Sequence, residues 1–344
     1  MPRVSITAVH RLTGVACVAV LALTGCASKQ TETAPAPLGP ASAAVAPAPN
    51  AAPAGEVRKL DGQPVAAVAD PGPGGLAVLG GSGPAAGAVV TVLGRDGAAA
   101  RTIALPAPAA TLVADGTGRA LAPTRGGYIT VDLVAGTAQR VDVDGAGQTE
   151  FTAIGRFPNG HLVLGSADGS VYILSSPTAV AHRDKKFTRV DSIVVQGDTA
   201  VVLDRGQTSV TAIGTDGQLQ QALRAGEGAT TMAADDAGRV LVADTRGEEL
   251  LVFGTDPLML RQRYPVHGAP FGVSGSPRLA WVSQTASNAV IGYDLSTGIP
   301  VEKVRYPTVQ QPNILAYDDT SGALYVVSGS GAGVQIIQKA GGPG

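Results

Sequence analysis

The sequence is poor in the residues that metal centres, disulfide frameworks and nucleic-acid interfaces require. The 344-residue chain has 2 cysteines and 4 histidines, and only 15% of its residues are charged. Its formal net charge of −2 excludes the positive surface by which proteins bind nucleic acid. Few charged and few aromatic residues argue against a coiled coil or an ordinary helical enzyme. The 46 glycines and 24 prolines instead favour a β protein rich in turns.

The first 25 residues have the pattern of a secretion signal. Arg3 and Arg11 accompany an apolar run, Leu12–Leu23, that is too short to span a bilayer as a permanent helix. The run ends in Leu23-Thr24-Gly25-Cys26, which resembles the bacterial lipobox, where the chain is cut before the cysteine and the thiol is acylated. The resemblance implies a signal peptide over 1–25 and a lipid anchor on Cys26 that holds the protein on the outer side of the cell membrane. The alternative is an ordinary cleaved signal with a chance cysteine.

The segment after the signal has the composition of a tether. Cys17 lies in the part that would be removed, so the mature chain would carry no disulfide although it is exported. Residues 26–54 comprise Cys26 and an Ala/Pro-rich stretch with six prolines and no apolar periodicity. Such a stretch cannot build a core, and we expect it to pack against nothing and to hold the next domain clear of the membrane. An unimportant linker would have the same composition.

One stretch, residues 229–268, shows the pattern around which the rest of the chain is organised. Four short runs rich in valine, leucine and tyrosine are separated by turns containing glycine, aspartate and proline. We expect strands at Ala229–Ala234, Arg239–Asp244, Leu250–Gly254 and Leu260–Val266.

This pattern recurs along the chain. The small turns before the second strand of each unit lie 37 to 46 residues apart, at Gly75, Gly118, Gly160, Gly197, Gly238, Ser276 and Gly322. A period near 40 residues with four strand-like runs per period is typical of β-propellers. Seven turns predict an all-β, seven-bladed propeller over residues 55–341.

Two of the units resemble known repeat families. Val240–Phe253 is similar to an NHL repeat, and Leu279–Asp294 resembles a YVTN-type repeat. The whole exported chain resembles actinobacterial propeller lipoproteins such as the mycobacterial LppL group. These resemblances imply a fold and a location but no activity.

The last unit lacks one strand. Strand-like runs occur at Ile314–Tyr317, Ala323–Val327 and Gly333–Gln338, and the chain then ends in a glycine-rich tail. The segment Glu56–Leu60, just after the tether, matches the fourth strands of other units. We therefore expect this N-terminal strand to complete the last blade and close the ring.

Catalytic and cofactor motifs are missing from the sequence. His161, His182 and His267 fall in different units without metal-ligand spacing, so neither a metal site nor a cofactor is predicted. The recurrent Asp-Gly pairs suit tight hairpin turns. No nucleophile elbow or phosphate loop occurs.

Two single residues have alternative interpretations. His267 follows a fourth strand, on the edge where some propeller enzymes place an axial histidine, and the alternative is a solvent-exposed loop residue. Trp281, the only tryptophan, lies in a second strand. We expect it to pack between neighbouring blades, and the alternative is a platform for a ligand.

Three units carry an Arg-Gly pair in the loop after their second strand, at Arg125, Arg205 and Arg246. These loops lie on one face of a propeller, so three guanidinium groups there would favour an anionic ligand or the carboxylates of a partner. The alternative interpretation is that each pair is simply a soluble hairpin tip.

Together these patterns predict a monomeric, membrane-anchored propeller lipoprotein. We expect it to bind or scaffold an envelope protein or ligand, and not nucleic acid. The alternative is a propeller enzyme, a lyase or a dehydrogenase, that works at an axial pocket.

Overall fold

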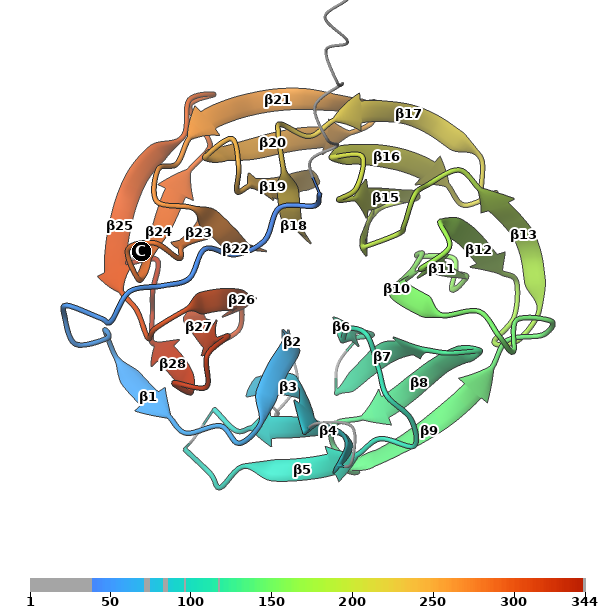
Figure 1. Ribbon diagram of the computed structural model, residues 1–344, viewed down its shortest axis with the longest axis horizontal. Helices are drawn as coiled ribbons and strands as arrows, with labels where there is room; N and C mark the ends of the chain where they lie inside the picture. Colours follow the sequence, from blue (N-terminus) through green and yellow to red (C-terminus); the bar gives the residue numbers. More distant parts are fainter. Residues whose placement is uncertain (1–38, 71–74, 83–85, 96, 117, 343–344) are drawn as a thin grey trace, which may run out of the picture. The chain divides into compact units, whose positions relative to one another are not determined.

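The architecture is a ring of seven β-sheets. The computed structural model describes residues 39–342 apart from 71–74, 83–85, 96 and 117. Within these residues the chain forms seven four-stranded antiparallel sheets and no helix. The sheets surround a central channel like the blades of a propeller (Figure 1). The predicted all-β, seven-bladed fold is confirmed.

The strands follow one another from the channel outward in each of the first six blades. Blade 1 comprises β2 (Gln63–Asp70), β3 (Gly75–Ser82), β4 (Ala86–Leu93) and β5 (Arg101–Ala104). Blade 2 comprises β6 (Val113–Ala114), β7 (Arg119–Thr124), β8 (Gly127–Asp132) and β9 (Thr137–Asp142). Blade 3 comprises β10 (Phe151–Arg156), β11 (Leu162–Ser166), β12 (Ser170–Leu174) and β13 (Val180–Lys185).

The next three blades have the same order. Blade 4 comprises β14 (Ser192–Gln196), β15 (Thr199–Asp204), β16 (Ser209–Gly214) and β17 (Leu219–Arg224). Blade 5 comprises β18 (Ala229–Ala234), β19 (Arg239–Asp244), β20 (Glu249–Thr255) and β21 (Leu258–Pro265). Blade 6 comprises β22 (Pro270–Gly275), β23 (Ala280–Gln284), β24 (Ala289–Asp294) and β25 (Val301–Pro307).

The last blade is completed by the start of the chain. It comprises β26 (Pro312–Asp318), β27 (Ala323–Ser328) and β28 (Val334–Ile337), with β1 (Glu56–Arg58) as its outer strand. β1 pairs antiparallel with β28, so that Glu56 lies opposite Ile336 and Arg58 opposite Val334. The predicted closure by an N-terminal strand is therefore confirmed.

Glycines allow the close approach of chains at the two ends of this pairing. A Cβ on Gly55 would lie 2.2 Å from the carbonyl oxygen of Ile336, and one on Gly333 would lie 2.3 Å from that of Arg58. Both residues also have positive φ angles, 75° and 100°. Any other residue would be strained there and would push β1 away from β28.

The core lies between neighbouring blades, because the middle strands of each blade are buried on both faces. In β19 and β23, for example, nearly every residue is buried. Trp281 is fully buried and stacks between Tyr306 of blade 6 and Tyr317 of blade 7, with ring centroids 6.4 and 6.2 Å away. The expectation that this tryptophan packs between blades is confirmed.

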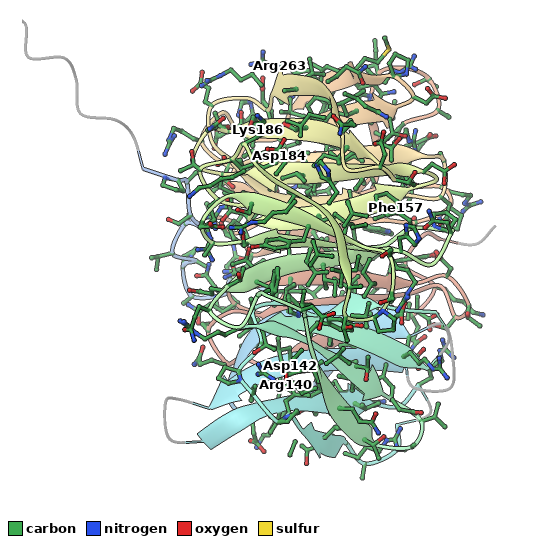
Figure 2. All side chains as sticks on the ribbon, turned by 90° about the vertical axis from the view of Figure 1, so that its right-hand side faces the viewer. Arg140, Asp142, Phe157, Asp184, Lys186 and Arg263 are labelled. Carbon is green, nitrogen blue, oxygen red and sulfur yellow. The ribbon has the colours of Figure 1, made fainter. Side chains whose placement is uncertain are left out.

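The outer strands carry the polar surface. Their exposed and half-buried residues alternate, as in β13 and β21. Charged side chains on these strands form pairs such as Arg140 with Asp142 at 2.7 Å and Lys186 with Asp184 at 3.7 Å (Figure 2). Exposed pairs of this kind contribute little to stability but keep the outer edges soluble.

The segment before β1 does not behave as the sequence predicted. Residues 39–54, which we call the strap, lie across one face of the propeller (Figures 1 and 2). Ala41 and Ala46 are buried, and six side chains of the propeller form hydrogen bonds with strap atoms. The expectation that the Ala/Pro-rich segment packs against nothing is thus wrong for this part. Residues 26–38, including Cys26, lie outside the described residues, and so does the proposed signal peptide.

Removing β1 is expected to destabilise the ring. A chain that begins at Asp61 lacks the three-residue pairing with β28, whereas one that begins at Gly55 keeps it. Loss of these hydrogen bonds and of the covered edge should lower the free energy of unfolding by about 2–4 kcal/mol. Urea denaturation of both chains measures the difference, and a chain that begins at Gly39 gives the separate contribution of the strap. Equal denaturation midpoints for the Gly55 and Asp61 chains would contradict closure by β1.

Candidate functional site

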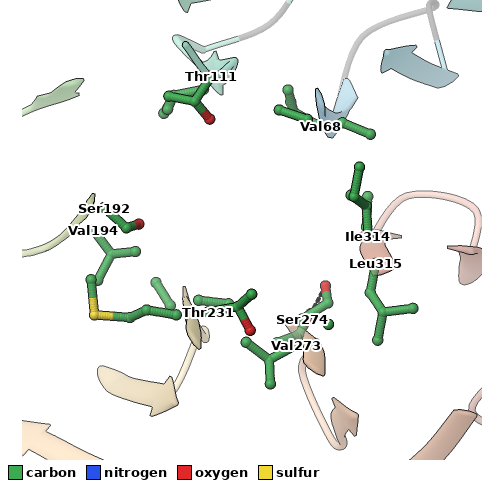
Figure 3. A pocket seen from close by; sticks show the side chains of 18 of the residues that line it. Val68, Thr111, Ser192, Val194, Thr231, Val273, Ser274, Ile314 and Leu315 are labelled. Carbon is green, nitrogen blue, oxygen red and sulfur yellow. Dashed lines mark hydrogen bonds between the residues drawn. The ribbon is translucent and has the colours of Figure 1, made fainter. Parts of the chain in front are cut away.

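The central channel is the main cavity that the innermost strands create. It has a volume of about 910 Å³ and is lined by residues of all seven blades. Each inner strand presents its edge and alternate side chains to this space, because the blades are arranged radially (Figures 1 and 3). A cavity of this size is within the range that small organic ligands occupy in proteins.

The wall of the channel combines small apolar groups with hydroxyl groups. Val68, Val194 and Ile314 provide apolar surface, and Thr111 and Ser192 present hydroxyl groups (Figure 3). Other hydroxyl groups of the wall are already bound by the protein itself. Thr152 donates to the carbonyl oxygen of Val190, and Thr231 to that of Phe271. The wall therefore combines apolar side chains with hydroxyl groups and with the main-chain groups of the strand edges, and would suit an organic molecule of mixed polarity.

One mouth of the channel is acidic. It lies on the face that carries the loops between first and second strands, which we call the acidic face. Asp236 from blade 5 and Asp319 from blade 7 both line the channel there. Their neighbours are neutralised: Asp235 binds Arg239 at 2.7 Å, and Asp318 binds Arg95 at 2.5 Å. Asp236 and Asp319 themselves form no hydrogen bond or ion pair within the described residues, so their charges face the opening.

The pKa of Asp319 reflects this environment. Burial in the mouth, the charge of Asp236 and the charge of Asp318 together raise the pKa of Asp319 to about 6. For the neighbouring Asp318, burial acts in the same direction, but hydrogen bonds from Arg95 and Ser321 outweigh it and lower its pKa. One carboxyl group at the mouth thus titrates close to neutral pH, which is a feature of many functional sites.

The opposite face, which we call the strap face, carries the loops between second and third strands. Two of the three Arg-Gly residues bind the strap there. The Arg246 guanidinium donates to the carbonyl oxygens of Gly39, at 2.7 Å, and Glu227, at 2.9 Å. Arg205 donates to the carbonyl oxygen of Ala41. Arg125 lies in blade 2 and makes no contact with the strap among the described residues. An anionic ligand on these three side chains stays a prediction.

His267 also lies away from the channel. Its side chain is 83% exposed, and its Nδ1 lies 3.0 Å from a carboxylate oxygen of Glu248. None of His161, His182 and His267 lines the channel within the described residues. In that same part of the chain, no three histidine, cysteine, aspartate or glutamate side chains are grouped closely enough to hold a metal ion. No helix there is long and apolar enough to cross a membrane.

Comparison with known proteins supports the fold. No protein-family model matches the sequence, and no curated protein is significantly similar to it. Among solved structures, a streptogramin B lyase matches with a TM-score of 0.66 and 12% identity, over 82% of this chain and 97% of that chain. A chain of the hydrazine synthase of Kuenenia stuttgartiensis matches with a TM-score of 0.65 and 13% identity, over 84% and 99%.

A third similar structure comes from an assembly of a different kind. A chain of the mitotic checkpoint complex matches with a TM-score of 0.68 and 11% identity, over 87% of this chain and 98% of that chain. At such low identity these likenesses show the fold alone. The class of protein is therefore a seven-bladed β-propeller. The resemblance to propeller lipoproteins stays a prediction.

The acidic mouth was not found from the sequence. Asp236 and Asp319 lie in turns where aspartate is expected for local reasons, and each turn looks like an ordinary hairpin. Only the ring brings two turns from blades 5 and 7 to one opening. Both residues lie just after an inner strand, and each has a second aspartate directly before it. This shared pattern was the only indication of an acidic mouth that the sequence offered.

Replacing Asp319 by asparagine is expected to stabilise the protein in a pH-dependent way. An unfolded aspartate ionises near pH 3.9, whereas Asp319 in the folded protein keeps its proton up to about pH 6. The free energy of unfolding therefore falls as pH rises between these values. Asp319→Asn should raise the thermal midpoint at pH 7.5 and leave it nearly unchanged at pH 3.5. Asp61→Asn, on an exposed loop, is the control and should show no such difference. A midpoint of Asp319→Asn equal to that of the wild type at both pH values would contradict this electrostatic account.

Proposed function

We propose that this protein is a lipid-anchored, extracytoplasmic binding protein that holds a small ligand in its propeller channel. The observation that carries the proposal is the channel itself: an open cavity of about 910 Å³ with two unpaired carboxylates at one mouth. The valine, threonine and serine side chains of its wall suit the body of an organic molecule. The carboxylates of Asp236 and Asp319 favour a ligand that carries an amine or another cation at one end.

The lipid anchor rests on the sequence. The lipobox-like Leu23–Cys26 follows a segment typical of secretion signals. Twelve residues, 27–38, separate Cys26 from the start of the strap. If extended, they would reach roughly 37 Å at about 3.1 Å per residue. An anchor at Cys26 would therefore keep the start of the strap within about that distance of the membrane.

An enzymatic role is the second candidate, and one observation favours it. Asp319 has a pKa of about 6, which suits a general base or acid near neutral pH. The streptogramin B lyase in the comparisons has the same fold but only 12% identity, so its activity is not carried over. The two roles differ in what happens to the ligand. A binding protein releases its ligand unchanged, whereas a lyase or dehydrogenase releases a chemically different product.

Blocking the channel tests the binding role. Thr111 faces the channel and its hydroxyl has no hydrogen-bond partner among the described residues, so Thr111→Trp should fill part of the cavity. Thr102→Trp, on the exposed outer strand β5, is the matched control. Ligands captured from envelope extract by the wild-type protein, identified by mass spectrometry, should be retained by Thr102→Trp. Thr111→Trp should bind them more than tenfold more weakly, which corresponds to about 1.4 kcal/mol.

Two outcomes would overturn this proposal. Equal capture by both variants would show that the channel is not the binding site. Release of a chemically altered molecule by the wild type would favour the enzymatic role, and Asp319→Asn would then abolish the conversion.

Replacing Cys26 by alanine tests the anchor. Without a thiol, acylation cannot occur, and stable membrane attachment needs more than one acyl chain. We expect the variant to leave the detergent-soluble membrane fraction or to remain unprocessed, with a mass that lacks lipid. Partition and mass identical to those of the wild type, apart from the substitution, would show that Cys26 carries no lipid.

A further inference from the structure

The strap is bound almost entirely through its backbone carbonyl groups. Arg246 donates to the carbonyl oxygen of Gly39, and Arg205 to that of Ala41. Gln311 Nε2 donates to the carbonyl oxygen of Ala44 at 2.7 Å. The carbonyl oxygen of Ala46 accepts from Gln310 at 3.2 Å. That of Pro47 accepts from Asn288 at 2.8 Å and from Gln310 at 3.2 Å. Side chains from three blades and one inter-blade link thus bind successive points of one extended segment.

Only one of these propeller side chains accepts a hydrogen bond from the strap between residues 39 and 50. Gln311 Oε1 accepts from the amide of Ala46 at 2.9 Å, while its Nε2 donates to the strap. A groove with many donors and few acceptors suits a chain that offers carbonyl oxygens but few N–H groups. Proline-rich segments have this property, because proline has no N–H. The strap contains four prolines, at positions 40, 47, 49 and 53.

The groove also selects small side chains at particular points. Ala41 is 7% exposed and Ala46 is 5% exposed, whereas Val45 between them is 92% exposed. The floor under Ala41 is formed by Gly228, where an added Cβ would lie 2.8 Å from the Cβ of Ala41. Recognition therefore combines carbonyl binding with two shallow sites that accept alanine, and it leaves the intervening residues free to vary.

The strap is not part of any sheet. Residues 39–53 form no strand, and their hydrogen bonds with the propeller before Ala54 are made by side chains of the propeller. A few such hydrogen bonds must offset the conformational entropy lost by about twelve ordered residues. The strap is therefore only weakly held. Because it forms no strand, it can leave the groove without breaking the hydrogen bonds between the strands of the blades.

We propose that the strap face is a peptide-binding groove for extended Ala/Pro-rich segments, which residues 39–50 fill in cis and a partner protein's segment of the same chemistry fills in trans. The inference does not depend on a ligand in the channel, because no strap residue lines the channel. The covalent link gives the strap a high effective concentration, so a partner must compete with it. Release of the strap is then the step that makes the groove available.

Cutting the strap in the folded protein tests this proposal. Asn50–Ala52 is an exposed turn, and a protease site inserted there lets the full-length protein be cut after folding. After removal of the released fragment, a labelled synthetic peptide of residues 39–50 should bind with one-to-one stoichiometry, measured by fluorescence anisotropy. A peptide with Val45→Trp should bind like the original, because this side chain points to solvent. A peptide with Ala46→Trp should bind at least tenfold more weakly, because the site for this residue is closed.

Protein variants provide the second comparison. Gln311→Ala removes both a donor and the acceptor of the groove and should weaken peptide binding at least tenfold. Arg125→Ala is the matched control, since it lies on the same face in the same dipeptide context as Arg205 but makes no contact with the strap. Three results would overturn the proposal: no saturable binding to the cut, folded protein; equal affinity of the Val45→Trp and Ala46→Trp peptides; or loss of the fold, seen by circular dichroism, once the strap fragment dissociates.

Discussion

The structure depends on the pairing of β1 with β28, because every blade packs against two neighbours only if the ring is closed. Without β1, the last blade would expose the edge of β28 while its inner strands remained wedged between blades 6 and 1. The closure pairs Glu56 with Ile336, which lies 280 positions later in the sequence (336 − 56), so it fixes the first and last blades together. The glycines at positions 55 and 333 are the local condition for it, since both allow the two backbones to meet.

The sequence was sufficient for the architecture because a propeller repeats its signals. Each blade has the same alternation of apolar runs and glycine-containing turns. A strand that is hard to assign in one blade can therefore be assigned by comparison with the others. The blade at 229–268 shows this well: the expected strand Ala229–Ala234 and the expected Arg239–Asp244 are those of the structure. The missing fourth strand of the last blade was visible for the same reason, because an incomplete repeat stands out against six complete ones.

The parts that the sequence did not predict are those formed by contacts that do not repeat. The strap has no apolar pattern, and it is held through carbonyl groups that every residue possesses. Arg205 and Arg246 were identified together with Arg125 as loop residues with a shared role, but their carbonyl partners on the strap could not be read from composition. Asp236 and Asp319 likewise meet only through the geometry of the ring. The two faces thus differ chemically: one is covered in part by the protein's own segment, and the other has an open, acidic mouth.

Hydrogen–deuterium exchange on the intact protein tests most directly the central claim, that β1 belongs to the ring whereas the strap is a removable occupant of its face. The amides of Glu56–Arg58 that bond to β28 should exchange as slowly as those of Val334–Ile337, because both require opening of the last blade. The amide of Ala46, bound only to a glutamine side chain, should exchange much faster through local release of the strap. Fast exchange in β1, or protection of Ala46 equal to that of the blades, would contradict this account.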